Sequence, residues 1–377
     1  TITYLTSSTS QCSDGLDNDF DGLVDWQYDL GCSSQNDLNE LSQSRVLEDG
    51  WTTFDLANDA EAVFVANNGN DGTCQTYNKT ELQSLAPGYS GLIPCLTVNR
   101  GIQLINGLAN NKPHWLLLRR GDTFSESISW IKSGRSVSEP VVIGSYGSST
   151  TQPTLQGGSF SSGVAFDYVA LTGIIFNNPS GNGITYIQPS GNYFLIEGNN
   201  IINPPISGIV IDGAVGKTNF EIRRNNIRNS NNNAIYLWGI TNGLIEENLI
   251  YDLDPTQPTN YHGMYIGDGN SNIDVIGNIV RINKQVGNAI MNRGGDEARN
   301  NFVLGTGWTA IVMKVHNNNC GASTLSCVPA VIYVNDNVIM EGVDSPTIDG
   351  VGIQIGDQNN PLPILISPGS QVNGNII

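Results

Sequence analysis

Four aspartates near the start of the chain have the spacing of a calcium-binding loop. Asp17, Asp19 and Asp21 alternate, Gly22 follows them directly, and Asp25 stands at the ninth position counted from Asp17. Oxygen ligands at this spacing can wrap one Ca²⁺, and the glycine permits the sharp turn that such a loop needs. Four carboxylates so close together would repel one another without a cation. We therefore expect Asp17, Asp19, Asp21 and Asp25 to hold a structural Ca²⁺.

The sequence does not identify the remaining ligands of this loop. Its twelfth position holds Tyr28, where an EF-hand has a bidentate glutamate, so Asp29 or Asp14 would have to complete the shell. The segment resembles the D-x-D-x-D-G-x-x-D calcium loops of dockerins and thrombospondin-type repeats. A solvated acidic turn without an ion is the alternative. Cys12 and Cys32 flank the loop and would close it covalently.

A second set of chemically capable side chains is scattered over about a hundred residues. Its members are Asp212, Tyr236, Trp238, His262, Tyr265, Arg293, Lys314 and His316. Histidine is rare in this chain, which has only 3. Whether these side chains meet depends on the elements that carry them.

A two-part repeat runs through this region. Its first part is a short segment of alternating apolar residues that begins at Gly183, Gly208, Ala234, Gly263, Ala289, Ala310 and Gly352. Its second part ends in an asparagine before an apolar residue, at Asn200, Asn226, Asn248, Asn278, Asn301, Asn337 and Asn375. The alternation predicts strands with one buried face, and a period of roughly 20 to 30 residues predicts a solenoid.

Coils of this length are too short for a strand, a helix and a return. We expect successive coils to stack as parallel sheets with rows of apolar residues inside. We also expect the recurrent asparagine to turn the corner with a positive φ and to bond to the asparagine one coil away.

The repeat resembles the right-handed parallel β-helix of the pectate-lyase-like superfamily. The resemblance extends upstream through residues 116–124, 140–147 and 171–176, and covers roughly residues 60 to 377. It implies an all-β chain, with a right-handed parallel β-helix solenoid over residues 51–377 after a small disulfide-closed calcium-loop module over residues 1–50. The superfamily contains lyases, hydrolases, epimerases, adhesins and phage fibres, so the fold alone selects no activity.

Aligning the first parts of the repeat places scattered side chains in two outward columns. One contains Asp212, Trp238, Gly267, Arg293, Lys314 and Gly356, and its neighbour contains Val210, Tyr236, Tyr265, Met291, Val312 and Gln354. With coils about 4.8 Å apart, the first column spans about 19 Å from Asp212 to Lys314, the length of a few sugar rings. Aromatic faces with polar flanks suit a carbohydrate. We expect an extracellular polysaccharide to bind here, through Trp238, Tyr236, Asp212 and His316. The alternative is a strand face that displays aromatic residues only because they favour strands.

The resemblance to β-helix lyases implies roles for the basic residues. In these lyases an Arg or Lys removes the proton next to a uronate carboxylate, a cation neutralises that carboxylate, and a Tyr or His serves as acid. The resemblance maps the base onto Lys314 or Arg293 and the acid onto His262 or Tyr265. For His262 the alternative is a polar turn residue bonded to the backbone.

A glycoside hydrolase is the second enzymatic interpretation. Polygalacturonases of this superfamily carry N-T-D, D-D, G-H-G and R-I-K motifs, and the chain has only partial matches at 262–263 and 281–284. Asp252 and Asp254 are separated by one residue rather than adjacent. Two carboxylates elsewhere could still flank a glycosidic bond.

Composition favours an extracellular protein. The chain has 35 acidic and 17 basic residues, and its net charge of −18 disfavours nucleic acid and anionic membranes as partners. Its 6 cysteines form the local couples Cys12/Cys32, Cys74/Cys95 and Cys320/Cys327, which favours disulfides and an oxidising compartment. No apolar run is long enough for a membrane-spanning helix, and the start at Thr1 is that of a processed chain. We expect a secreted or cell-surface location.

A structural or adhesive surface protein is the non-enzymatic alternative. The last phrase of the repeat, residues 374–377, ends in mid-coil. Exposed strand edges pair readily, so we expect this end to be covered by another domain, further residues or another chain. Self-association of β-helix ends into filaments would be one such arrangement.

Overall fold

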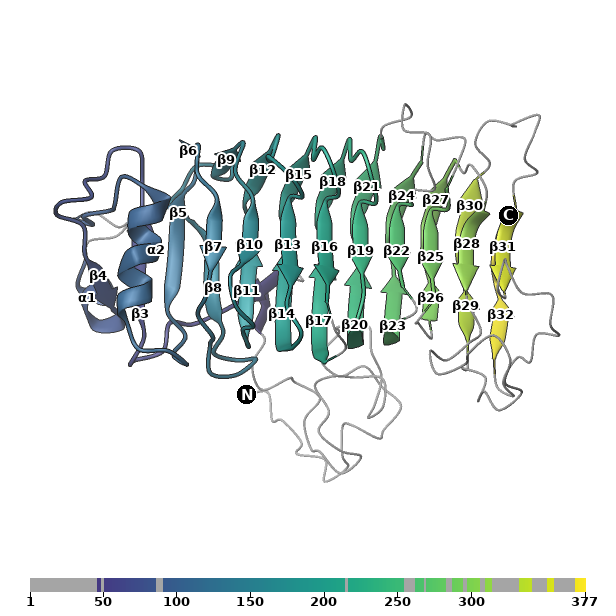
Figure 1. Ribbon diagram of the computed structural model, residues 1–377, viewed down its shortest axis with the longest axis horizontal. Coiled ribbons are helices and arrows are strands. Elements are labelled where there is room, and N and C mark those ends of the chain that lie inside the picture. Colours follow the sequence, from purple (N-terminus) through teal and green to yellow (C-terminus); the bar gives the residue numbers. More distant parts are fainter. Residues whose placement is uncertain are drawn as a thin grey trace, which may run out of the picture.

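Parallel strands wound into successive coils form the body of the molecule (Figure 1). The computed structural model describes residues 46–48, 51–85, 91–213, 216–253, 262–267, 269–282, 287–293, 297–305, 309–313, 332–340, 351–355 and 370–377. Within these ranges the strands of neighbouring coils pair in parallel, and only the pairs β1–β2 and β3–β4 are antiparallel. The fold is the parallel β-helix that the repeat predicts.

The described coils build three sheets. Sheet 1 contains β7 (Ile128–Trp130), β10 (Phe160–Ser162), β13 (Ile184–Ile187), β16 (Ile209–Asp212), β19 (Ile235–Leu237), β22 (Met264–Ile266), β25 (Ile290–Asn292), β28 (Thr309–Met313) and β31 (Val351–Ile355). Sheet 2 contains β4 (Thr76–Asn78), β3 (Glu61–Val65), β5 (Trp115–Arg119), β8 (Val141–Tyr146), β11 (Val169–Thr172), β14 (Gly191–Glu197), β17 (Lys217–Arg223), β20 (Ile240–Glu246), β23 (Ser271–Ile276), β26 (Glu297–Arg299), β29 (Tyr333–Asn335) and β32 (Gln371–Asn373). Sheet 3 contains β6 (Thr123–Phe124), β9 (Thr154–Gln156), β12 (Ile175–Asn177), β15 (Asn200–Ile202), β18 (Asn226–Arg228), β21 (Leu249–Tyr251), β24 (Ile279–Arg281), β27 (Phe302–Leu304) and β30 (Val338–Met340).

The register of sheet 1 agrees with the alignment of the repeat. Tyr236 pairs with Val210 in the preceding coil and with Tyr265 in the following coil. Its neighbours Ile235 and Leu237 point inward and are 0% and 2% exposed. Because equivalent residues stack coil upon coil, their apolar side chains form continuous rows in the core.

A row of buried asparagines lines the corner between sheets 2 and 3. It consists of Asn199, Asn225, Asn248, Asn278, Asn301 and Asn337, and it ends at the partly exposed Asn375. At each step one amide oxygen accepts two bonds from the previous coil, as where the backbone N–H and Nδ2 of Asn225 both donate to Asn248 Oδ1 at 3.0 Å. The ladder is confirmed, but its first two members are Asn199 and Asn225. The predicted Asn200 and Asn226 are instead the first residues of β15 and β18 and pair with each other in sheet 3.

The ladder asparagine is not the residue that turns this corner, so that part of the expectation was wrong. The positive φ belongs to the residue before it, such as Glu247, with a φ of 51°, before Asn248. The left-handed residue directs its side chain outward, as the 49% exposed side chain of Glu247 shows, whereas the ladder amide must point inward. Asparagines with a positive φ do stack at the corner after sheet 3, where Asn203 Nδ2 donates to Asn178 Oδ1 at 2.8 Å.

Helix α2 (Val98–Gly107) closes the N-terminal end of the core, where it packs against β3, β5 and β7 (Figure 1). Its buried residues are Val98, Gly101, Ile102 and Ile105. A Cβ on Gly101 would lie 2.8 Å from the Val65 side chain and 2.9 Å from that of Leu116, so only glycine lets the helix approach this closely. The shorter α1 (Lys79–Ser84) follows β4. Neither described helix has the length and apolar character needed to cross a membrane.

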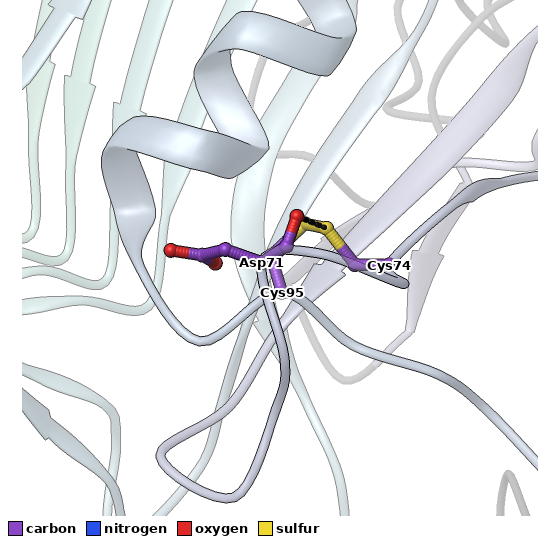
Figure 2. A group of neighbouring side chains, drawn as sticks. All are labelled: Asp71, Cys74 and Cys95. Carbon is purple, nitrogen blue, oxygen red and sulfur yellow. Dashed lines mark hydrogen bonds between the residues drawn. A yellow bond between two sulfur atoms is a disulfide. The ribbon is translucent and has the colours of Figure 1, made fainter.

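A disulfide between Cys74 and Cys95 joins the loops beside this cap (Figure 2). The predicted pairing of these two cysteines is therefore confirmed. The other predicted pairs, Cys12/Cys32 and Cys320/Cys327, lie outside the described residues.

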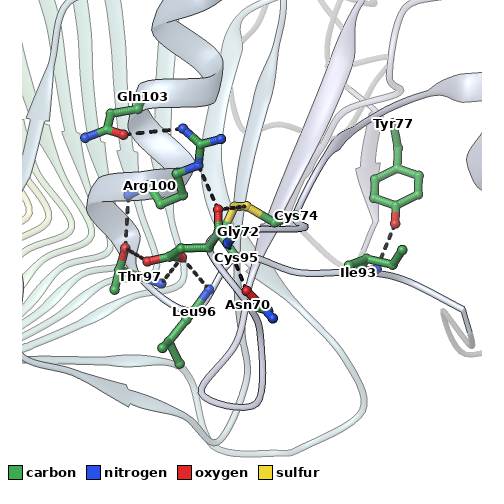
Figure 3. Close-up of a disulfide and its surroundings, with 11 residues drawn as sticks. Asn70, Gly72, Cys74, Tyr77, Ile93, Cys95, Leu96, Thr97, Arg100 and Gln103 are labelled. Carbon is green, nitrogen blue, oxygen red and sulfur yellow. Dashed lines mark hydrogen bonds between the residues drawn. A yellow bond between two sulfur atoms is a disulfide. The ribbon is translucent and has the colours of Figure 1, made fainter.

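Asp71 ties the same loops to the start of α2. Its partners Leu96, Thr97 and Arg100 lie beside the disulfide in Figure 3. Its carboxylate accepts the N–H groups of Leu96 and Thr97 at 2.8 and 3.0 Å and the Thr97 hydroxyl at 2.7 Å. Its carbonyl oxygen accepts Arg100 Nε at 3.2 Å. Burial alone would raise the pKa of Asp71, but these hydrogen bonds outweigh it and hold the pKa below its usual value.

The hairpin of β1 (Val46–Glu48) and β2 (Trp51–Thr53) packs on the outer face of sheet 2. Thr52 N–H donates to Glu197 Oε2 at 3.1 Å. The Trp51 ring lies against Gly198, and the guanidinium of Arg224 is 5.3 Å from the ring centroid. The two strands lie on either side of the expected domain boundary at residue 50. The predicted calcium ligands, Asp17 to Asp25, lie outside the described residues.

Candidate functional site

Tyr265, in the middle of β22, is the centre of an aromatic cluster on the outer face of sheet 1. Its ring stacks on that of Tyr236 in the preceding coil, with centroids 5.5 Å apart and planes 4° from parallel. The stacking follows from the register, because directly paired residues of adjacent coils are about 4.8 Å apart. Both rings are partly exposed. The aromatic pair expected from the sequence is therefore present on the surface.

A cation lies against this pair. Arg293 follows β25 in the next coil, and its guanidinium carbon is 5.4 Å from the centroid of the Tyr265 ring. An aromatic face attracts a cation at this distance. Arg293 N–H donates to Ile266 O at 2.9 Å, which puts Arg293 in the expected column one coil after Gly267. The other expected basic residues, Lys314 and His316, lie outside the described residues.

His262 is buried beside Tyr265. It is 4% exposed, and its ring centroid is 5.3 Å from that of Tyr265. Its Nδ1 accepts the N–H of Asn288 at 2.9 Å, and its own N–H donates to Asn233 Oδ1 at 2.8 Å. With Nδ1 as an acceptor, the neutral ring carries its proton on Nε2. These are the contacts of a polar turn residue, and they also hold the imidazole against the phenol ring.

Asp212 and Tyr236 border the cluster on the N-terminal side. Asp212 ends β16, is partly exposed, and accepts the N–H of Gly213 on Oδ1 at 2.6 Å. Burial raises the pKa of Tyr236, and the charge of Asp212 and the neighbouring Tyr265 add to the effect. The Tyr236 hydroxyl therefore stays protonated at neutral pH and can donate a hydrogen bond.

Lys217 is a charged neighbour that the sequence reasoning missed. It begins β17, is 0% exposed, and its Nζ donates to Gln188 O at 3.3 Å. Burial lowers the pKa of Lys217, and the charge of Asp212 opposes that shift. In the sequence, Lys217 stands among turn residues, where a lysine side chain is expected to be solvated. Nothing in the sequence indicates that Lys217 lies inside the solenoid.

The second expected column is not open along its whole length. Val210, Met291 and Val312 are 9%, 2% and 2% exposed, although they pair in register with the tyrosines or continue their row. Because adjacent coils stand about 4.8 Å apart, close-packed neighbouring side chains leave little room for water between them. In the described part of this face, the aromatic surface is confined to the coils of β19 and β22.

Trp238 follows β19 in the column of Asp212 and Arg293. Its N–H donates to Ile211 O at 2.8 Å, and the residue is partly exposed. Its indole ring covers Gly267 and Gly269 of the next coil. The structure therefore brings together six of the eight expected site residues: Asp212, Tyr236, Trp238, His262, Tyr265 and Arg293.

One group of acidic and cysteine side chains among the described residues is close enough to bind a metal. It contains Asp71, Cys74 and Cys95, whose candidate ligand atoms lie within 4.8 Å of one another (Figure 2). The two sulfurs are bonded to each other, and the Asp71 carboxylate points away from them toward the N–H groups that it accepts. This group is therefore a structural cross-link rather than a metal site.

Comparison with known proteins adds a likeness of fold. No protein-family model and no curated protein matches the chain. Several solved structures are similar to it, among them the following three. An alginate lyase from Paenibacillus sp. str. FPU-7 is 14% identical with a TM-score of 0.38, and the match covers 75% of this chain and 98% of the lyase.

The other two structures are similarly distant. A GH136 lacto-N-biosidase from Eubacterium ramulus is 10% identical with a TM-score of 0.46, covering 84% of this chain and 68% of that enzyme. A rhamnogalacturonan lyase is 12% identical with a TM-score of 0.45, covering 80% of this chain and 87% of the lyase. Likenesses at these identities and TM-scores identify neither a substrate nor a reaction.

Proposed function

We propose that this chain binds an extracellular polysaccharide on the outer face of sheet 1 and cleaves it as a uronic-acid polysaccharide lyase. The observation that carries the proposal is the environment of Tyr265, which is stacked on Tyr236 and lies 5.4 Å from the guanidinium carbon of Arg293. Aromatic rings suit the C–H faces of sugars, and a guanidinium suits a carboxylate. An acidic sugar satisfies both kinds of group at once.

The elimination needs a base, a charge-neutralising cation and an acid. The base removes the proton next to the uronate carboxylate, its electron pair forms a carbon–carbon double bond, and the glycosidic oxygen leaves and takes a proton from the acid. Of the two base candidates, Lys314 suits the role better, because an arginine stays protonated in proteins. Arg293 then neutralises the carboxylate.

Tyr265 is the better candidate for the acid. The other candidate, His262, is 4% exposed and engages backbone through Nδ1, so a sugar oxygen reaches Tyr265 first. In this proposal His262 positions Tyr265, while Trp238, Tyr236, Asp212 and His316 bind the sugar.

The test uses the full chain with alginate, pectate and a neutral cello-oligosaccharide. The unsaturated product of elimination is followed by its ultraviolet absorbance, and binding is measured by calorimetry. We expect Arg293→Ala to weaken binding of the acidic polymers, and Tyr265→Phe to abolish product while binding persists. Arg281→Ala and Tyr251→Phe are matched controls on sheet 3. Binding of no polymer by the wild-type chain would refute the proposal.

Binding without turnover is the second candidate. It is favoured by His262, whose hydrogen bonds serve the corner of the solenoid rather than a substrate. A structural or adhesive surface protein of this kind would bind a polysaccharide and release no unsaturated product. A hydrolase would release product with a reducing end and no double bond.

The calcium loop and the extracellular location are part of the same proposal. Asp17, Asp19, Asp21 and Asp25 would hold a structural Ca²⁺, and the Cys74–Cys95 disulfide suits an oxidising compartment. We expect chelation of Ca²⁺ to lower the thermal midpoint, with Asp19→Asn giving the same shift in excess Ca²⁺. An unchanged midpoint in chelator would contradict a structural ion.

A further inference from the structure

Trp238 rests on two glycines of the next coil. A Cβ on Gly267 would lie 2.4 Å from Trp238 Cε3 and 2.9 Å from Cζ3. A Cβ on Gly269 would lie 2.7 Å from both Nε1 and Cε2 of the same indole. The six-membered ring therefore covers one glycine and the five-membered ring covers the other.

The need for glycine at these two positions is steric. Neither Gly267 nor Gly269 has a positive φ, so the backbone does not require glycine there. At less than 3 Å from the ring, any side chain would force the indole away, because non-bonded carbon atoms approach to about 3.5 Å. The missing side chains leave a flat floor on which the indole lies.

This floor of Gly267 and Gly269 lies beside the other groups on the outer face of sheet 1. Gly267 stands in the outward column between Trp238 and Arg293, as the backbone bonds from Gly267 N–H to Leu237 O and from Arg293 N–H to Ile266 O show. The indole thus fills the place that a side chain at 267 would occupy. The stacked rings of Tyr236 and Tyr265 stand in the neighbouring column.

We infer that Gly267 and Gly269 are positioning residues that seat Trp238 as a stacking platform for one sugar ring of the polysaccharide. The inference rests on the proposed function and names a subsite within it. The apolar C–H face of a pyranose ring would lie on the indole, with the carboxylate of the acidic sugar toward Arg293. Gly267 and Gly269 act only through the ring that they support.

The test compares single and double variants of the full chain. Oligogalacturonate and oligoalginate serve as probes, and calorimetry measures binding. We expect Trp238→Ala and Gly267→Ala each to weaken binding about tenfold, the size of one aromatic contact with its buried area. We expect Gly267→Ala to add nothing in a Trp238→Ala background, because its effect passes through the indole. Gly181→Ala is the matched control, since a Cβ there would meet nothing within 4 Å.

A spectroscopic readout separates seating from a general loss of structure. We expect the near-ultraviolet circular dichroism of the wild type to change when a probe binds, and this change to be absent from Trp238→Phe and reduced in Gly267→Ala. Thermal midpoints of the variants establish that they are folded.

Three outcomes would overturn the inference and can be told apart. If the wild type binds a probe and both Trp238→Ala and Gly267→Ala bind it equally well, the platform is refuted while the proposed function stands. If the wild type binds neither probe, the proposed function fails and the platform fails with it. Additive losses in the double variant would show that Gly267 acts by a route other than Trp238.

Discussion

The buried asparagine ladder and the aromatic face of sheet 1 are built from the same coils but follow opposite rules. In the ladder, seven successive coils place the same residue type at the same corner with the same hydrogen bonds. On the face, consecutive coils place Asp212, Trp238, Gly267 and Arg293 at one position. Stacking requires repetition inside, because each buried amide must find an identical partner. Outside, no such requirement holds, and differences between coils are free to serve binding.

His262 belongs to another corner of the coil, which lies between sheet 3 and sheet 1 and borders the aromatic face. It stands in a corner row with Asn233 and Asn288 and makes the backbone bonds of that row. It also stacks on Tyr265, as no asparagine could. The two roles can therefore be separated by substitution.

The largest expected effect is the loss of one ladder amide. Asn248 is 0% exposed, and its side chain makes four hydrogen bonds: Oδ1 accepts the backbone N–H and Nδ2 of Asn225, and Nδ2 donates to Ile222 O and Asn278 Oδ1. We expect Asn248→Ala to destabilise the fold by about 2 to 5 kcal/mol, because buried donors and acceptors lose their partners. Urea unfolding measures the change.

Asn200→Ala is the control for this prediction. Asn200 lies at the start of β15 on the outside of sheet 3, and its amide bonds to Gln152 Oε1 at 2.8 Å. We expect a loss of about 1 kcal/mol or less from this partly exposed bond. Equal losses at the two positions would show that the buried ladder has no special weight.

A smaller effect is expected from His262→Asn, which sharpens the comparison directly. An asparagine can accept the Asn288 N–H, as Asn233 Oδ1 accepts that of His262, so we expect the stability to change by about 1 kcal/mol or less. The stack on Tyr265 is lost, and we expect sugar binding to weaken by about tenfold. Calorimetry with oligogalacturonate measures the second effect. Full binding by a stable His262→Asn variant would show that His262 serves only the corner row of Asn233 and Asn288.

The smallest effect concerns pH and the histidine of the cap. His114 is buried, with Nδ1 accepting Glu61 N–H at 3.1 Å and Nε2 bonded to Ala109 O at 3.0 Å. Burial lowers the pKa of His114 in the folded chain. The unfolded chain binds a proton below about pH 6.5, so stability is full above that pH and declines as the pH falls toward the lowered folded value.

The measurement is the thermal midpoint between about pH 7.5 and 5, above the range in which most carboxylates titrate. We expect the midpoint to fall across this window in the wild type and to change less in His114→Gln. The same slope in both proteins would assign the pH dependence to other groups.

Much of the architecture could be predicted because it depends on local periodicity. The alternation in residues such as Ile209 and Ile211 and the spacing of the repeat led to the parallel β-helix, to the register of sheet 1 and to a ladder of asparagines. The ladder was misplaced by one residue at Asn200 and Asn226, because each of these coils has two consecutive asparagines and the spacing does not show which one points inward. Helix α2 lies outside the repeat, so the repeat does not predict it.

The site could be predicted only as a set of positions. The register alone brings Tyr236 beside Tyr265 and Arg293 into the column of Trp238, since equivalent residues of stacked strands must be neighbours. Burial and side-chain direction depend on all the neighbours at once. For that reason the closure of the column at Met291 and Val312, the backbone bonds of His262 and the position of Lys217 were not foreseen.

The sequence by itself determined the repeating interior of this protein, because each coil states the same pattern of apolar residues and asparagines and the pattern has one stacked solution. Only the tertiary structure decided what the outer face is. In the sequence, Gly267 is only a position without a side chain in the outward column. In the structure, it supports Trp238, because the indole of the preceding coil lies across it. Such contacts depend on side-chain rotamers, and packing decides the rotamers. The spacing of residues along the chain therefore does not predict these contacts.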